Sequence, residues 1–138
     1  VEDLLKKNKM FDAVVIVEII EHLYDEQLDN MLTEILGFLN PGGIAIFTTP
    51  NDEDLDASII YSPSTGEVFH RWQHVRSWNR DSLSKRLECS GYEVIDVVET
   101  NMSNQMPNTL FKRMKWLVKQ ILVTYPKKPH LLCVAVKA

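Results

Sequence analysis

The sequence is poor in cysteine. Only Cys89 and Cys133 occur in 138 residues, and they lie far apart without a paired spacing. Small secreted domains that rely on disulfides carry more cysteines at closer spacings. The sequence therefore excludes a disulfide-stapled domain and favours a reducing compartment. We expect the cytoplasm as the location and both thiols to be buried.

Long apolar runs and an excess of basic residues are also absent. A membrane-spanning helix needs roughly eighteen or more consecutive apolar residues, and the start of the chain lacks the pattern of a signal peptide. Lys and Arg together number 15 against 19 Asp and Glu, which gives a net charge of -4 and a pI near 5.5. Nucleic-acid binders neutralise phosphates with basic surfaces. We therefore expect a soluble protein for which nucleic acid is an unlikely partner by charge.

A strand, a helix and a second strand follow one another in the first 50 residues. The run "AVVIV" at 13–17 is β-branched and nearly unbroken, which is typical of a strand covered on both faces. From Asp25 onward apolar residues recur at helical spacing, until "NPGG" at 40–43 stops the helix. The run "IAIFTT" at 44–49 predicts the next strand. This order predicts a right-handed βαβ unit and the α/β class.

The next segment, residues 51–77, shows no regular pattern. Connections of this length inside compact domains usually carry function, so we expect ligand contacts here. A helix should follow, with Asn79 or Ser77 as its N-cap and Gly91 just past its end.

Two further strands are predicted, "YEVIDVVET" and "HLLCVAVKA", with an insertion at about 101–129 between them. The insertion contains an amphipathic helix rich in lysine. We expect it to cap the active site, and peripheral membrane contact through 108–123 is the alternative.

Two carboxylates and an imidazole end the first strand, in the stretch "VEIIEHL" at 17–23. Ligands of open α/β sheets bind beyond the carboxyl ends of parallel strands, where Glu18 lies. If this stretch turns into a helix, Glu18, Glu21 and His22 share one face. Such a set suits Mn, Fe, Co or Zn, with His74 or His70 available as a further ligand.

Two other interpretations of this cluster stand beside metal binding. The acids could simply favour the first turn of a helix through its dipole, with His22 bonded to the backbone. Alternatively, His22 could act as a general base activated by Glu18 or Glu21, because the ordinary pKa of histidine, about 6.5, suits proton abstraction near neutral pH.

Three segments between Phe11 and Val97 resemble the class I S-adenosylmethionine-dependent methyltransferases. They are "FDAVVIVEIIEHL", "LTEILGFLNPGGIAIFTTPN" and "HVRSWNRDSLSKRLECSGYEVIDV". They are similar to the family's fourth strand, its crossover helix with the fifth strand, and the later helix and strand. The resemblance implies a partial Rossmann-like sheet of mainly parallel strands, with helices on both faces and an antiparallel last strand at Leu131 to Val136.

The resemblance covers only the later half of the family's domain. The Gly-rich turn after the family's first strand is not found, and Gly42-Gly43 ends a helix rather than beginning one. That turn supplies close backbone approach to the cofactor. We therefore expect the chain to be the C-terminal portion of a methyltransferase domain. An N-terminal half or a partner chain would complete the sheet, and this segment alone should be nearly inactive.

Site residues follow from the resemblance position by position. Val17 and Glu18, at the end of the first strand, are expected to contact S-adenosylmethionine. The "E-x-x-E-H" pattern is associated with a divalent metal in ubiquinone-biosynthesis O-methyltransferases and in small-RNA 3′-terminal ribose methyltransferases. His74, four residues before Trp78, stands where the RNA enzymes place another metal-binding histidine. The implied metal ligands are Glu18, Glu21, His22 and His74, and the implied catalytic residues are His22 and His74.

The resulting functional prediction is methyl transfer from S-adenosylmethionine to a hydroxyl of a small molecule, glycan or lipid precursor. The first alternative is a metal-dependent ribose methyltransferase of RNA ends. The second is a non-catalytic half-domain that serves as an interaction module.

Overall fold

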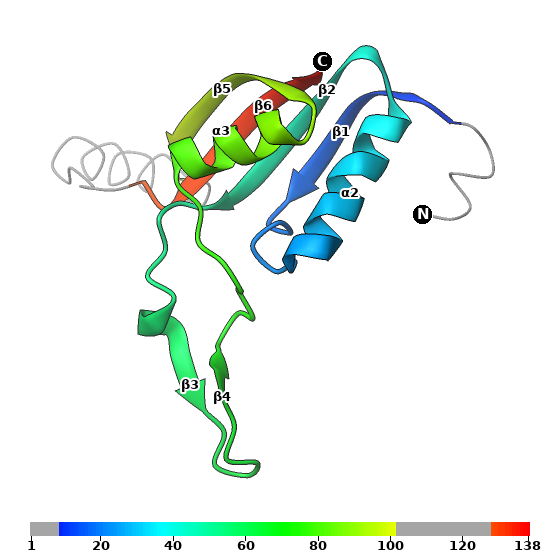
Figure 1. The fold of residues 1–138 in the computed structure, drawn as a ribbon. Helices are drawn as coiled ribbons and strands as arrows, with labels where there is room; N and C mark the ends of the chain where they lie inside the picture. The colour runs from blue at the N-terminus through cyan, green and yellow to red at the C-terminus, as the bar shows by residue number, and fades with distance from the viewer. Residues whose placement is uncertain (1–8, 102–127) are drawn as a thin grey trace, which may run out of the picture.

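The computed structural model describes residues 9–101 and 128–138. They form a four-stranded sheet, a separate two-stranded hairpin, two α-helices and a 3₁₀ turn (Figure 1). In chain order the elements are β1 (Phe11–Val17), α2 (Asp25–Phe38), β2 (Leu39–Pro50), η1 (Asp56–Ser58), β3 (Ile59–Tyr61), β4 (Val68–His70), α3 (Arg80–Cys89), β5 (Tyr92–Thr100) and β6 (His130–Lys137).

The main sheet has the strand order β1-β2-β6-β5. Strands β1 and β2 are parallel, with Val15 opposite Ile46, and β6 is antiparallel to both of its neighbours, β2 and β5. Three of the four strands therefore run in one direction and the last runs against them. This arrangement confirms the predicted α/β class and the antiparallel final strand.

Both described helices pack against the same face of this sheet (Figure 1). Helix α2 buries Leu28, Leu32 and Ile35, and α3 buries Leu83 and Leu87. The central strands meet them with small and aromatic side chains. Those residues are Ala45, Phe47, Cys133 and Ala135.

The opposite face is open in the described part of the chain. Val15 is 60% exposed, and Val17 and Ile95 are also exposed. The expectation of helices on both faces is thus met by the described residues on one face only. Apolar side chains on a sheet face are normally covered by another element.

Helix ends follow their local chemistry. The Asn79 side chain accepts a hydrogen bond of 2.8 Å from the Ser82 amide, which makes it the N-cap of α3 as predicted. Gly91 follows the helix with φ +90°, a conformation that L side chains rarely adopt. Helix α2 begins at Asp25, and strand β2 begins at Leu39, five residues before the expected start.

Residues 51–77 are more ordered than the sequence indicated. They contain the 3₁₀ turn and the hairpin of β3 and β4, whose tip is closed by a hydrogen bond from the Ser62 amide to the Glu67 carbonyl. Each hairpin strand has three residues, which is too short for an alternating pattern to be recognised.

The two cysteines differ in exposure. Cys133 is buried in β6 as expected, whereas Cys89 is exposed at the end of α3, so the expectation for Cys89 was wrong. The predicted insertion helix and the segment 108–123 lie outside the described residues. Within the described residues, none of the helices has the length and hydropathy needed to cross a membrane.

Candidate functional site

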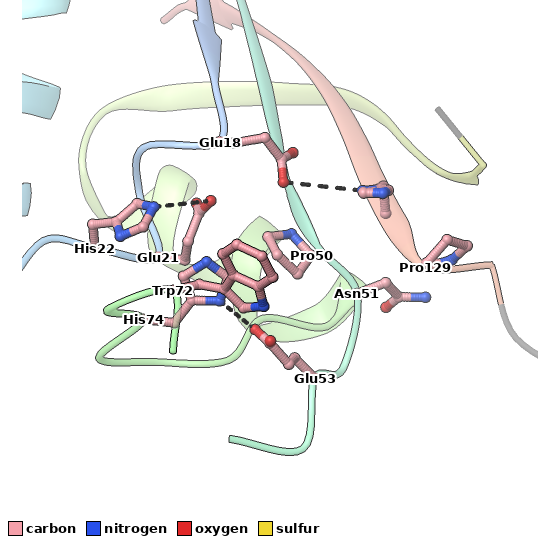
Figure 2. A pocket seen from close by; sticks show the side chains of 10 residues that line it. Glu18, Glu21, His22, Pro50, Asn51, Glu53, Trp72, His74 and Pro129 are labelled. Carbon is pink, nitrogen blue, oxygen red and sulfur yellow. Dashed lines mark hydrogen bonds and ion pairs between the residues drawn. The ribbon is translucent and has the colours of Figure 1, made fainter. Parts of the chain in front are cut away.

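The site lies where β1 and β2 end. Glu18 follows β1 directly, and its amide donates to the Thr48 carbonyl at 3.0 Å. Its φ of 49° is in the left-handed region, which is uncommon outside glycine and often accompanies functional sites. Ligands of α/β sheets bind at this edge, so the polar side chains that gather here form the candidate site (Figure 2).

Residues 18–22 form a bend and a turn rather than the helix assumed from the sequence. The His22 amide bonds to the Ile19 carbonyl at 3.0 Å, and Ile20 is buried in the core. The turn separates Glu18 from Glu21 and His22, so these three side chains do not share one helical face.

Glu21 is 1% exposed, although it is a carboxylate. Its Oε2 accepts a hydrogen bond of 3.0 Å from the Thr49 hydroxyl, while its Oε1 is buried without a hydrogen-bond partner. Burial raises the pKa of Glu21 above its ordinary value, although bonds from its own backbone and from Thr49 partly oppose the shift. A buried carboxylate oxygen without a donor is costly, so a cation or a proton donor is expected beside it.

Two imidazoles meet Glu21 at this point. His22 Nε2 lies 3.8 Å from Glu21 Oε1, and the rings of His22 and His74 are in edge contact with centroids 4.8 Å apart. His74 reaches the site because the next residue, Val75, donates its amide to the Glu21 carbonyl at 2.9 Å. One potential ligand atom from each of Glu21, His22 and His74 lies within 4.8 Å of the other two.

The hydrogen-bond partner of His22 shows which ring nitrogen carries the proton. Its Nδ1 lies 3.3 Å from the Gln73 carbonyl, which can only accept a hydrogen bond. In the neutral ring Nδ1 therefore carries the proton, and Nε2 presents a lone pair toward Glu21.

Glu18 and Val17 are placed elsewhere. Glu18 Oε2 lies 4.0 Å from His130 Nδ1, across the mouth of the site, and Glu18 does not belong to the group formed by Glu21, His22 and His74. Val17 is 54% exposed on the open face of the sheet. Of the four expected metal ligands, the structure brings three together and sets Glu18 apart.

A cavity of about 630 Å³ joins these groups. Pro50, Trp72 and Pro129 supply its apolar wall, while Glu18 and His130 lie along the same cavity as Glu21 and the two histidines. Asn51 links its two sides, because the Asn51 amide groups donate to the Pro129 carbonyl at 2.8 Å and to the Lys128 carbonyl at 2.9 Å.

Three lining residues were missed from the sequence: Glu53, Asn51 and His130. Glu53 was not singled out from its acidic neighbours in the sequence, yet its Oε2 lies 2.5 Å from His74 Nδ1. His130 opens β6, and no role was predicted for it beyond being the first residue of the stretch predicted as the last strand. Their position could have indicated them, because each lies beside the end of a strand that neighbours the site.

The donor set fits the ion that the sequence suggested. One carboxylate oxygen and two imidazole nitrogens suit Zn, Mn, Fe or Co better than Mg or Ca. Glu21 Oε1, which has no hydrogen-bond partner, is the atom that such an ion would contact.

Comparisons with known proteins give a consistent family. The profile described as "Methyltransferase domain" matches residues 1–97. The small RNA 2′-O-methyltransferase of Drosophila melanogaster is 33% identical over 72 residues, which cover 52% of this chain and 18% of that protein. A probable S-adenosylmethionine-dependent methyltransferase of Mycolicibacterium smegmatis is 33% identical over 87 residues, which cover 63% of this chain and 30% of that protein.

A solved structure shares the fold. The Burkholderia thailandensis 1,6-didemethyltoxoflavin-N1-methyltransferase aligns with a TM-score of 0.58 at 14% identity, over 95% of this chain and 45% of that one. The chain thus spans less than a third of these curated relatives and less than half of this solved structure.

Proposed function

The chain belongs to the class I S-adenosylmethionine-dependent methyltransferases, as the sequence predicted, and on that premise we propose that the protein methylates a hydroxyl group with the help of a divalent ion. S-adenosylmethionine is the cofactor of this family. The single observation that supports ion assistance is the buried, unpartnered Oε1 of Glu21 beside two imidazoles.

Glu21, His22 and His74 would hold the ion. When bound, a divalent ion lowers the pKa of a hydroxyl that it contacts, so that the hydroxyl becomes a better nucleophile. Thr49 fixes the Glu21 carboxylate by its hydrogen bond to Oε2, and the backbone bond from Val75 fixes His74 beside it. Without a bound ion, the lone pair on His22 Nε2 would instead serve as a base that takes the hydroxyl proton directly.

The acceptor is proposed to be a small molecule with an apolar or aromatic body. Trp72, Pro50 and Pro129 offer it a surface, and the carboxylates of the site would repel an acidic one. Positioning the acceptor against the methyl donor would supply much of the rate. A glycan or a lipid precursor with a comparable apolar part fits the same description.

The remaining cofactor contacts are proposed to come from a segment that pairs beyond β1. Val17 and Glu18 stay predicted cofactor contacts at the strand end. Strand β1 lies at the edge of the described sheet, so a further strand would pair there, and the exposure of Val15 and Val17 supports an additional layer over the open face. With two free cysteines, the cytoplasm remains our proposed location.

RNA-end ribose methylation is the second candidate. The 33% identity to a small RNA 2′-O-methyltransferase favours it, and so does the group of Glu21, His22 and His74. The net charge of -4 disfavours it, because RNA binding needs basic surface.

Calorimetric titration with Mn²⁺ and Co²⁺ tests the ion site. Wild type should bind one ion, and Glu21→Ala and His22→Ala should each weaken binding at least tenfold. Glu67→Ala, which changes an exposed carboxylate of the hairpin, is the control and should bind as wild type does. Absence of binding, or binding unaffected by both site variants, would reject ion assistance.

Methyl transfer from labelled S-adenosylmethionine separates the candidates. A hydroxylated aromatic panel and a short RNA with a free 3′ end should be offered to the protein alongside an N-terminal half, if one precedes this segment. Transfer to the RNA alone would replace the leading candidate with the second. With the N-terminal half present, ion binding without transfer to any acceptor would favour the non-catalytic module.

A further inference from the structure

Three side chains form a line behind the candidate ion site. His70 ends β4, Glu53 follows β2, and His74 lies between the hairpin and α3. Glu53 Oε1 lies 3.6 Å from His70 Nε2, and Glu53 Oε2 lies 2.5 Å from His74 Nδ1. His70 is 7% exposed, and the side chains of Glu53 and His74 are 19% and 10% exposed. Water therefore has little access to these contacts.

The backbone determines where the proton of His70 lies. Its Nδ1 receives the amides of Trp72 at 3.3 Å and His74 at 3.1 Å. An amide N–H can only donate, so Nδ1 must be the unprotonated nitrogen. The proton of the neutral ring is then on Nε2, which faces Glu53.

This tautomer argues against a second ion among Glu53, His70 and His74, although their ligand atoms lie within 4.8 Å of one another. An ion bound there would need the lone pair of His70 Nε2, and that position carries the proton. His70 Nε2–H instead faces Glu53 Oε1 at 3.6 Å, which is longer than a hydrogen bond, and it has no hydrogen-bond partner among the described residues.

The other oxygen of Glu53 faces His74. A carboxylate can only accept, so His74 presents an N–H at Nδ1. The lone pair of the neutral His74 ring is then on Nε2. In Figure 2 the edge of the ring away from Glu53 faces the side on which Glu21 and His22 lie.

We infer that Glu53, backed by His70, is a positioning residue that holds His74 as the Nδ1–H tautomer and directs Nε2 toward Glu21 and His22. The inference concerns the proton on His74, and its importance for catalysis rests on the proposed function. Carboxylates that hold a ligating histidine in this way typically raise metal affinity by about 10- to 100-fold.

Histidine tautomers can be measured directly. We suggest long-range ¹H–¹⁵N correlation spectra of ¹⁵N-histidine-labelled protein at about pH 8, above the ordinary histidine pKa of about 6.5. His70 and His74 are assigned by the loss of their signals in His→Gln variants. Wild type should show a proton on Nδ1 of His74 and on Nε2 of His70.

Two variants of Glu53 change its contact with His74 in different ways. Glu53→Ala removes the acceptor, so His74 should become a mixture of both tautomers. Glu53→Gln keeps the shape but replaces the charged acceptor with a neutral amide, so the hydrogen bond from His74 Nδ1–H should weaken and the His74 signal should shift. Glu67→Gln is the matched control and should leave both signals unchanged.

Observation of Nε2–H on His74 in wild type, or of an unchanged His74 signal in both Glu53 variants, would overturn the inference. Co²⁺ titration separates this failure from that of the proposed function. If wild type binds no Co²⁺ but the tautomer follows Glu53, the inference stands and ion assistance falls. If Co²⁺ binds equally in wild type and Glu53→Ala while the His74 signal stays unchanged, ion binding stands and the inference falls.

Discussion

The Thr49 hydroxyl donates a hydrogen bond to Glu21 Oε2 at 3.0 Å and leaves Glu21 Oε1 without a partner. Thr49 is 0% exposed and Glu21 is 1% exposed, so this bond holds a buried charge that water cannot reach. The carboxylate is fixed through Oε2, and Oε1 remains available to the proposed ion.

Thr49→Val should therefore destabilise the protein by about 1–3 kcal/mol, because it removes the donor and leaves Glu21 Oε2 buried without one. Urea unfolding without divalent ions measures the loss. Thr48→Val is the matched control on the same strand. The Thr48 hydroxyl shares the Glu18 amide with the Thr48 carbonyl, so its loss leaves that amide bonded. Equal effects of both substitutions would contradict the role of Thr49.

The raised pKa of Glu21 predicts that Glu21→Gln increases the free energy of unfolding by an amount that depends on pH. A carboxyl whose pKa is raised on folding stabilises the native state below its unfolded pKa, near 4.5, and this contribution is lost as the pH rises through the folded pKa. Glutamine does not titrate. The stability of Glu21→Gln relative to wild type should thus grow from pH 4.5 upward and then level off. Urea unfolding at a series of pH values with a chelator present tests the sign, and a difference that shrinks as the pH rises would refute it.

Divalent ions should stabilise wild type more than Glu21→Gln and so reverse the stability difference between the two proteins. An ion that binds only the native state stabilises it by about 2.7 kcal/mol at a free concentration of 100 times its Kd. Thermal unfolding with added Mn²⁺ should raise the Tm of wild type and leave that of Glu21→Gln nearly unchanged. A similar rise in both proteins would point to binding elsewhere.

Substituting alanine at two different glycines tests the role of backbone strain. Gly91 has φ +90°, and a Cβ there would lie 3.3 Å from Leu36 Cδ1, so Gly91→Ala should cost about 1–2 kcal/mol. Gly37 lies in α2 with no atom within 4 Å of its Cβ position, so Gly37→Ala should stabilise by about 0.5–1 kcal/mol. Opposite signs in denaturant unfolding are expected, and a stabilising Gly91→Ala would contradict the strain argument.

Tyr92 connects β5 to α2. Its hydroxyl donates to the Leu32 carbonyl at 2.8 Å in the buried core, and burial raises its pKa above the ordinary value. Tyr92→Phe should cost about 1 kcal/mol in unfolding free energy. Tyr61→Phe, at an exposed hairpin position, should change stability little. A null effect of Tyr92→Phe would show that the carbonyl finds another donor.

The elements that the sequence predicted well are those whose local chemistry is self-sufficient. The apolar run before Glu18 became β1, Asn79 capped α3, and the last apolar run became strand β6, although its antiparallel direction was implied only by the family resemblance. In each case the pattern repeats or a side chain completes a local hydrogen bond, so distant residues are not needed to specify it.

The candidate site was predicted only in part because its geometry depends on a turn and on distant partners. Glu21, His22 and His74 meet, but Glu18 faces His130, since the chain bends at 18–22 instead of continuing as a helix. Glu53 has no local mark that separates it from neighbouring acids. Its partners lie 17 and 21 residues farther along, and only the folded hairpin brings them to it.

Strand β6 follows β5 in the sequence but lies between β2 and β5 in the sheet. In the described sheet, β5 hydrogen-bonds to β6 alone. During synthesis, β1, α2 and β2 can assemble from neighbours close in sequence, whereas β5 must wait for a strand that emerges about 30 residues later. Loss of residues 130–137 would therefore split the sheet through its middle rather than shorten an edge.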